Sequence, residues 1–229
     1  MELKISLRLN EKLYLRDPES TDLGRRILKQ GIVLIFQLGF ESFTFKKLAE
    51  EIHTTEASIY RYFENKHRLL LYIVTWYWSY LEYQVVFNIN NLSDPNTKIK
   101  RVLDLLTHEL DDSLGTVDFD KKALFNIVIN ESNKAYLSKD VDENNVAHLF
   151  KPYKDLCARI AALFLEYNPH YRFARSLAST VIESAHFQYF FAQHLPRLTD
   201  VKGKEDTTTI QAFLENVVFA ALSADSDKY

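Results

Sequence analysis

Glycine and proline are scarce in this chain, with five of each among 229 residues. Sandwiches and barrels need turn-forming residues about every 8–12 positions, so this scarcity weighs against any many-stranded fold. Apolar residues make up 47% of the chain and charged residues 26%, which supplies a sizeable core and argues against a disordered chain. We therefore expect an all-α globular protein.

Apolar residues recur at helical spacing along most of the chain, and capping residues mark where helices begin and end. Thr21 or Asp22 is suited to begin the first helix, and Gly39 to end it. Thr44, Thr55 and Asn65 are suited to begin the next three. The pattern predicts about nine helices, over residues 22–38, 45–52, 56–63, 66–87, 95–114, 119–137, 144–167, 170–195 and 209–222.

The cysteine count and the lengths of the apolar runs indicate the cellular compartment of the protein. A single cysteine, Cys157, excludes an internal disulfide framework and a cysteine-based zinc site. The first residues lack the apolar block of a signal peptide, and the longest nearly apolar run, residues 69–81, is too short for a membrane span. We expect a cytoplasmic protein with no membrane partner.

Two short predicted helices between residues 45 and 64, joined by a tight turn at His53-Thr54, have the dimensions of a helix-turn-helix. Ala49 is small at the point where the two helices must cross. The residues expected to form their shared core are Leu48, Ile52, Ile59 and Phe63. Residues 1–75 carry a net charge of +2 and residues 76–229 a net charge of −5, which is consistent with DNA contact at the N-terminal end.

The stretch TFKKLAEEIHTTEASIYRYFENK, from Thr44 to Lys66, together with Leu69-Leu70, resembles the DNA-binding module of the tetracycline-repressor (TetR) family. The resemblance covers roughly residues 22–71. It departs from the family at His53-Thr54, where a glycine and an aliphatic residue are usual, and at Glu56, whose carboxylate would lie near phosphates or accept from a cytosine amino group. Both departures bear on the operator sequence.

We expect three parts. The residue pattern predicts an arm or hairpin over residues 1–19, longer than the family usually has, and the resemblance implies a DNA-binding domain over 20–66 and a helical body over 67–229 that binds a small molecule and forms a homodimer. A dimer would present two recognition helices to a palindromic double-stranded operator. The predicted DNA-contacting residues are Thr44, Lys46, Thr55, Glu56, Ala57, Ser58, Tyr60, Arg61, Tyr62 and Lys66.

An aromatic stripe along residues 72–87 either packs in the core or forms the wall of a pocket for an apolar or aromatic effector. The predicted pocket residues are Trp76, Tyr80, Phe125, Ile129, Phe150, Tyr153, His186 and Tyr189. The last two helices carry apolar stripes that either are buried within the subunit or form a four-helix dimer interface. The predicted interface residues are Leu177, Ala178, Val181, Ala185, Phe213, Leu214 and Val217.

The first residues alternate between apolar and polar types, which predicts a β-like hairpin or extended arm. Its basic residues Lys4, Arg8, Lys12 and Arg16 either form a solvated edge or contact DNA.

Glu-x-x-His occurs at residues 50–53, 64–67 and 183–186, but the first two pairs fall in or beside the helix-turn-helix and cannot converge with the third. We expect no catalytic residues, metal or cofactor. The prediction is a ligand-responsive regulator, a repressor that a small effector releases from its operator. The alternatives are a transcriptional activator, or a helical interaction protein that binds no operator.

Overall fold

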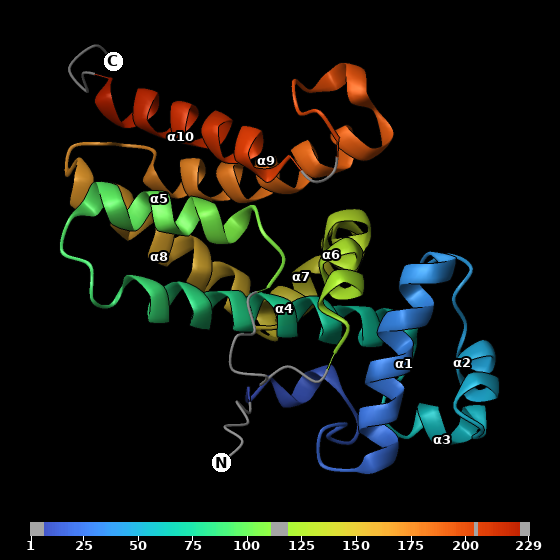
Figure 1. Cartoon of the computed structure of the whole chain (residues 1–229). Helices are drawn as coiled ribbons and strands as arrows, with labels where there is room; N and C mark the ends of the chain where they lie inside the picture. Colours follow the sequence, from blue (N-terminus) through green and yellow to red (C-terminus); the bar gives the residue numbers. More distant parts are fainter. Residues whose placement is uncertain (1–6, 111–118, 204–205, 225–229) are drawn as a thin grey trace. The chain divides into compact units, whose positions relative to one another are not determined.

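A computed structural model describes residues 7–110, 119–203 and 206–224, and within these ranges the chain is helical and contains no β-strand (Figure 1). The predicted all-α class is confirmed. The helices are α1 (Asp22–Leu38), α2 (Phe45–Glu51), α3 (Glu56–Tyr60), α4 (Lys66–Ile89), α5 (Pro95–Leu106), α6 (Lys121–Tyr136), α7 (Val141–Val146), α8 (Lys151–Tyr167), α9 (Ala174–His194) and α10 (Thr207–Ser223), with short 3-10 helices at Glu11–Leu13 and Pro196–Leu198.

The predicted caps position the first four helices. Thr21, Thr44 and Thr55 each accept a hydrogen bond from the backbone N–H three residues later, at 3.0, 3.2 and 3.2 Å. Asn65 does the same for α4 at 2.9 Å. Gly39 ends α1 with a φ of 74°, a conformation that glycine adopts without strain.

Two predicted helices differ from the structure. The predicted helix over residues 144–167 is wrong, because α7 ends at Val146 and α8 begins only at Lys151. The break centres on His148, whose φ is 60°, and Pro152 in the first turn of α8 is the sequence signal for it. α5 ends at Leu106, where the Thr107 N–H turns back to the carbonyl of Asp104 at 3.1 Å. The predicted end of that helix, residues 111–114, lies outside the described residues.

The β-like hairpin predicted for the N-terminal arm is wrong where the arm is described. Residues 11–13 form a 3-10 helix that Asn10 caps. Leu13 is fully buried whereas Leu15 is 66% exposed, so the side chains do not alternate as a strand would require. The Leu15 N–H donates to the carbonyl of Tyr62 at 2.8 Å, which joins the arm to the segment between α3 and α4. Residues 1–6, with Lys4, lie outside the described residues.

The chain divides into two compact units, one formed by residues 1–80 and 112–152, the other by residues 81–111 and 153–229. In the first unit α1 packs against α2 and α6, and α2 packs against α3. In the second unit α10 packs against α5 and α9. The domain boundaries predicted at residues 19 and 66 stay predictions. Among the described helices, none is both long and apolar enough to cross a membrane.

Candidate nucleic-acid interface

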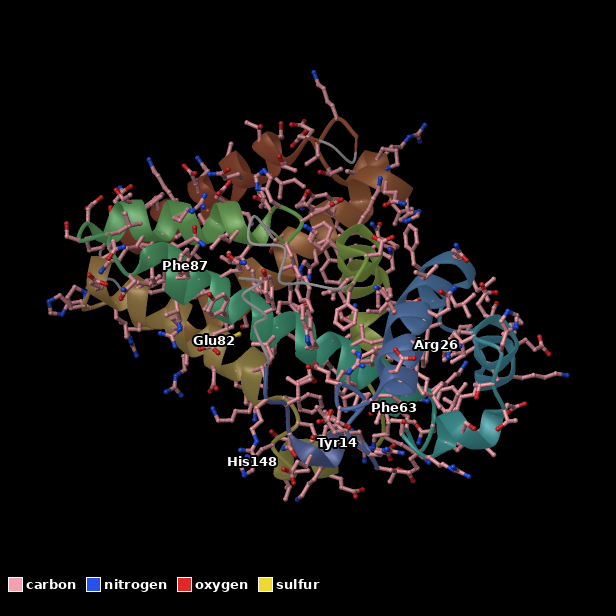
Figure 2. The ribbon with its side chains drawn as sticks, turned by 60° about the horizontal axis from the view of Figure 1, so that its bottom comes forward. Tyr14, Arg26, Phe63, Glu82, Phe87 and His148 are labelled. Atoms are coloured by element: carbon pink, nitrogen blue, oxygen red, sulfur yellow. The ribbon has the colours of Figure 1, made fainter. Side chains whose placement is uncertain are left out.

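The turn between α2 and α3 has the geometry that a helix-turn-helix requires. His53 adopts a φ of 52°, and the Thr54 N–H returns to the carbonyl of Ala49 at 2.9 Å. Arg26 of α1 donates to the carbonyl of Ile52 and so completes the end of α2; its place beside α1 can be followed in Figure 2. A histidine thus occupies the left-handed position of the turn, and an arginine of α1 completes the end of α2.

The predicted shared core of this motif is buried. Leu48, Ile59 and Phe63 are fully buried, and Ile52 is 5% exposed. Tyr72 of α4 extends this core, because the rings of Phe63 and Tyr14 both pack against it edge to face, at 5.5 and 6.1 Å between centroids (Figure 2). The arm and the helix-turn-helix therefore share one apolar cluster.

Most of the predicted DNA-contacting residues lie on the surface. Tyr60 is 47% exposed, and its ring packs edge to face on Phe45 at 5.0 Å, which holds the phenol in one place. The others that are exposed or half-buried, on α2, α3 and their caps, are Thr44, Lys46, Thr55, Glu56, Ala57, Ser58 and Arg61. This surface, called the α3 face below, consists of those eight residues.

Tyr62 does not belong to that surface. It is 2% exposed, and its hydroxyl lies 2.7 Å from the hydroxyl of Thr21, which caps α1. The Arg16 guanidinium lies over its ring at 5.4 Å from the centroid. The sequence-based assignment of Tyr62 to DNA is therefore corrected: the residue joins the arm and α1 to the motif.

Lys66 is engaged within the protein. Its Nζ donates to the carbonyls of Phe40, Glu41 and Phe43, at 2.9, 3.1 and 3.2 Å. An ammonium group has three N–H donors, and these three bonds use all of them. The predicted phosphate contact is corrected accordingly: Lys66 holds the segment between α1 and α2.

Replacing Lys66 by alanine is expected to weaken DNA binding about threefold to tenfold without changing its salt dependence, because no phosphate contact is lost. Lys46→Ala, at an exposed position on α2, is the matched control and should lower the slope of log K against log salt by about one. Fluorescence anisotropy across a salt series measures both slopes. A lower slope for Lys66→Ala would restore it to the phosphate-contacting set.

The predicted pocket residues are divided between the two units. In the first unit Trp76, Tyr80, Phe125 and Phe150 are buried, Ile129 is half-buried, and Trp76 stacks on Tyr80 at 5.3 Å. The apolar space beside Trp76 is too small to admit a water molecule and is also lined by Leu28, Ile32, Tyr72, Ile73, Phe119 and Leu124. In the first unit these aromatic residues mostly fill the core.

In the second unit the predicted pocket residues carry specific hydrogen bonds. Tyr153 donates its hydroxyl to Glu183 at 2.7 Å, and Tyr189 donates to the carbonyl of Thr107 at 2.7 Å. His186 is 4% exposed, and burial lowers its pKa from 6.5 to about 4. Glu183 is half-buried beside Tyr153, whereas His186 lies in the core. Within the described ranges no three His, Cys, Asp or Glu side chains gather as metal ligands do.

His186 should make the protein less stable as the pH falls. A histidine whose pKa is about 4 when folded and 6.5 when unfolded binds its proton in the unfolded state first, so stability is lost between these values. Between pH 7 and 5.5 the loss is about 1 kcal/mol. Urea denaturation at both pH values should show this loss in the wild type and a smaller one in His186→Leu. Equal losses in both proteins would contradict the assignment.

Most of the predicted dimer residues are core residues of the subunit. Leu177, Ala178, Val181, Ala185 and Leu214 are buried in the single chain, so the apolar stripes of α9 and α10 face inward, and these assignments are corrected. Phe213 is 44% exposed and Val217 half-buried, and these two face outward on α10. Phe187 of α9, at 41% exposed, was not predicted.

Glu131 of α6 is a further residue that the sequence reasoning missed. It is 8% exposed and accepts the backbone N–H of Phe40 at 2.9 Å. A signal was present: along α6, Leu124, Val128 and Ala135 share one buried face at helical spacing, and Glu131 occupies a position on that same face. A carboxylate within an apolar stripe marks a buried polar contact.

Comparisons with known proteins agree with this geometry. Residues 27–73 match the family model of bacterial regulatory proteins of the tetR family. No curated protein matches the sequence. Among solved structures, AibR in complex with isovaleryl coenzyme A and operator DNA is 16% identical, with a TM-score of 0.60 over 85% of this chain and 97% of that one.

Two further structures share the fold. A TetR/AcrR-family transcriptional regulator from Thermobifida fusca is 18% identical, with a TM-score of 0.54 over 87% of this chain and 97% of that one. The superantigen PfiT is 14% identical, with a TM-score of 0.60 over 92% of this chain and 100% of that one.

The helix-turn-helix thus lies in the segment that matches a family of bacterial regulatory proteins, and the chain as a whole shares its fold with a solved transcriptional regulator. Residues 27–73 match the N-terminal domain of the TetR family, and most of the chain shares the fold of AibR.

Proposed function

We propose that this protein binds a palindromic DNA operator as a homodimer and represses transcription until a small apolar or aromatic effector releases it. The observation that carries the proposal is the α3 face: eight residues of suitable size and polarity surround a short helix whose other side is anchored in a buried core. Such a helix can enter a major groove without unfolding its support.

The effector half of the proposal has support from the fold and from AibR. The structure of AibR was determined with both isovaleryl coenzyme A and operator DNA, so a chain of this fold accommodates a small molecule and an operator together. In this chain, Trp76 and its apolar neighbours in the first unit enclose a space too small for a water molecule, so an effector that binds there must displace these side chains. An apolar or aromatic effector of matching shape is the ligand class that this lining favours.

The homodimer half rests on the outward surface of the last two helices. Phe213 and Val217 on α10, together with Phe187 on α9, place apolar side chains on the outer surface of the second unit. A two-fold axis through such a surface is the common way to pair two identical subunits. The half-sites of the operator would then be about 34–36 Å apart.

Selection from a random duplex library with the wild-type chain of 229 residues, followed by anisotropy across a salt series, tests operator binding. We expect a palindromic sequence that binds at least 100-fold more tightly than scrambled DNA, with sedimentation showing a dimer on each duplex. Equal, weak binding of selected and scrambled DNA would overturn the operator function.

A second candidate function has one observation in its favour. PfiT, described as a superantigen, shares the fold at the same TM-score as AibR, which illustrates that a fold does not determine its function. A helical interaction protein would bind all DNA alike, so the same selection experiment separates the two functions.

A further inference from the structure

A carboxylate is buried inside the first unit, where α6 packs beside α1 (Figure 1). Glu131 is 8% exposed, and carboxylates are rarely buried unless they are paired. Its Oε1 accepts the Phe40 N–H at 2.9 Å, and its Oε2 lies 2.7 Å from the Nζ of Lys134. One oxygen therefore engages the lysine of its own helix and the other engages backbone 91 residues earlier in the chain.

The Phe40 N–H is a donor that α1 does not use. Gly39 donates its own N–H to the carbonyl of Ile35 at 2.9 Å and then turns the chain away with a φ of 74°. In a Schellman ending, the N–H after such a glycine returns to a carbonyl of the same helix. Here it is donated to Glu131 instead, so a side chain of α6 completes the end of α1.

The segment that Glu131 holds, residues 39–44, is called the α1–α2 loop. Lys66 of α4 donates to three carbonyls of this loop, and its Nζ lies 4.7 Å from the centroid of the Phe40 ring. Lys134 adds an ion pair to Glu41 at 3.2 Å. The loop ends at Thr44, the N-cap of α2, so its position sets where the helix-turn-helix begins.

We infer that Glu131 is a positioning residue that ties the helix-turn-helix to α6, so that DNA affinity depends on where α6 holds the α1–α2 loop. This inference rests on the proposed DNA-binding function. Glu131 is buried behind the loop and is not one of the eight residues of the α3 face. Its substitution therefore changes the placement of the DNA-contacting helix and leaves the contacting side chains intact.

Three variants of the whole chain separate the hydrogen bond to Phe40 from the ion pair with Lys134. Glu131→Leu removes both the bond to Phe40 and the pair with Lys134. Glu131→Gln retains an oxygen that can accept from Phe40 and loses the ionic pair. Asn130→Ala is the matched control, because Asn130 is the exposed neighbour of Glu131 on α6. Hydrogen exchange of the Phe40–Phe43 amides and anisotropy on the duplex selected by the wild type are both measured, with the melting temperature as a reference.

We expect Glu131→Leu to raise exchange at the Phe40 amide at least tenfold and to weaken binding of the selected duplex about tenfold. Glu131→Gln should be intermediate in both, and Asn130→Ala should match the wild type. Unchanged exchange at Phe40 would overturn the role of Glu131, as would faster exchange with full DNA affinity. If the wild type selects no duplex, the DNA function itself falls, whereas the exchange result still decides whether Glu131 holds the loop.

Discussion

Replacing Gly24 by alanine is expected to lower the free energy of unfolding by about 3 kcal/mol, at the upper end of typical overpacking costs. A Cβ on Gly24 would lie 2.2 Å from the carbonyl oxygen and 2.6 Å from the Cα of Pro18. These are backbone atoms, and no flexible side chain is present to move aside. Either α1 or the segment that leads into it must shift. The Gly24 N–H also donates to the side chain of Thr21, the N-cap of α1.

The same helix supplies the control for this substitution. A Cβ on Gly31 would meet only the Cδ2 atoms of Leu69 and Leu48, at 3.4 and 3.9 Å, which is ordinary packing. Because alanine favours a helix over glycine by about 1 kcal/mol, Gly31→Ala should be as stable as the wild type or more so. Urea denaturation measures both variants. A Gly24→Ala variant as stable as Gly31→Ala would show that residue 18 does not pack against α1.

The parts of the fold that the sequence predicted are those determined by neighbouring residues. A threonine or asparagine cap bonds to an N–H three residues later, so Thr44, Thr55 and Asn65 could be assigned without knowing the rest of the structure. The tight turn at His53 is equally local. The exposure of most residues of the α3 face could also be predicted, because once the buried residues of a short helix are assigned, the remaining ones must face solvent.

The assignments that needed correction depend on residues far apart in the chain. Lys66 and Tyr62 have the chemistry of DNA-contacting residues, and only the α1–α2 loop and the arm show that they are engaged elsewhere. An apolar stripe on α9 indicates burial but not which partner buries it, and Leu177 and Val181 are buried within the subunit. The break between α7 and α8 at His148 is the exception, because Pro152 in the first turn of α8 is a local signal for it.

Arg61→Ala is expected to weaken binding of the selected operator about 10- to 100-fold, while binding of scrambled DNA weakens far less. Arg61 is exposed at the C-terminal end of α3, where an arginine can reach a guanine edge with two parallel N–H donors. The loss of one such pair costs about 1–3 kcal/mol and relaxes specificity at one base position. Anisotropy on the selected duplex and on duplexes with each base replaced measures both effects.

The control for Arg61→Ala must remove the same charge without altering the α3 face. Arg197→Ala does this, because Arg197 is exposed in the short 3-10 helix of the second unit. If both variants weaken binding equally on every duplex, the loss reflects net charge alone, because long-range attraction to DNA does not distinguish sequences. If only Arg61→Ala loses selectivity, and at one base position, the α3 face reads bases, and the operator is recognised by direct contact rather than by charge.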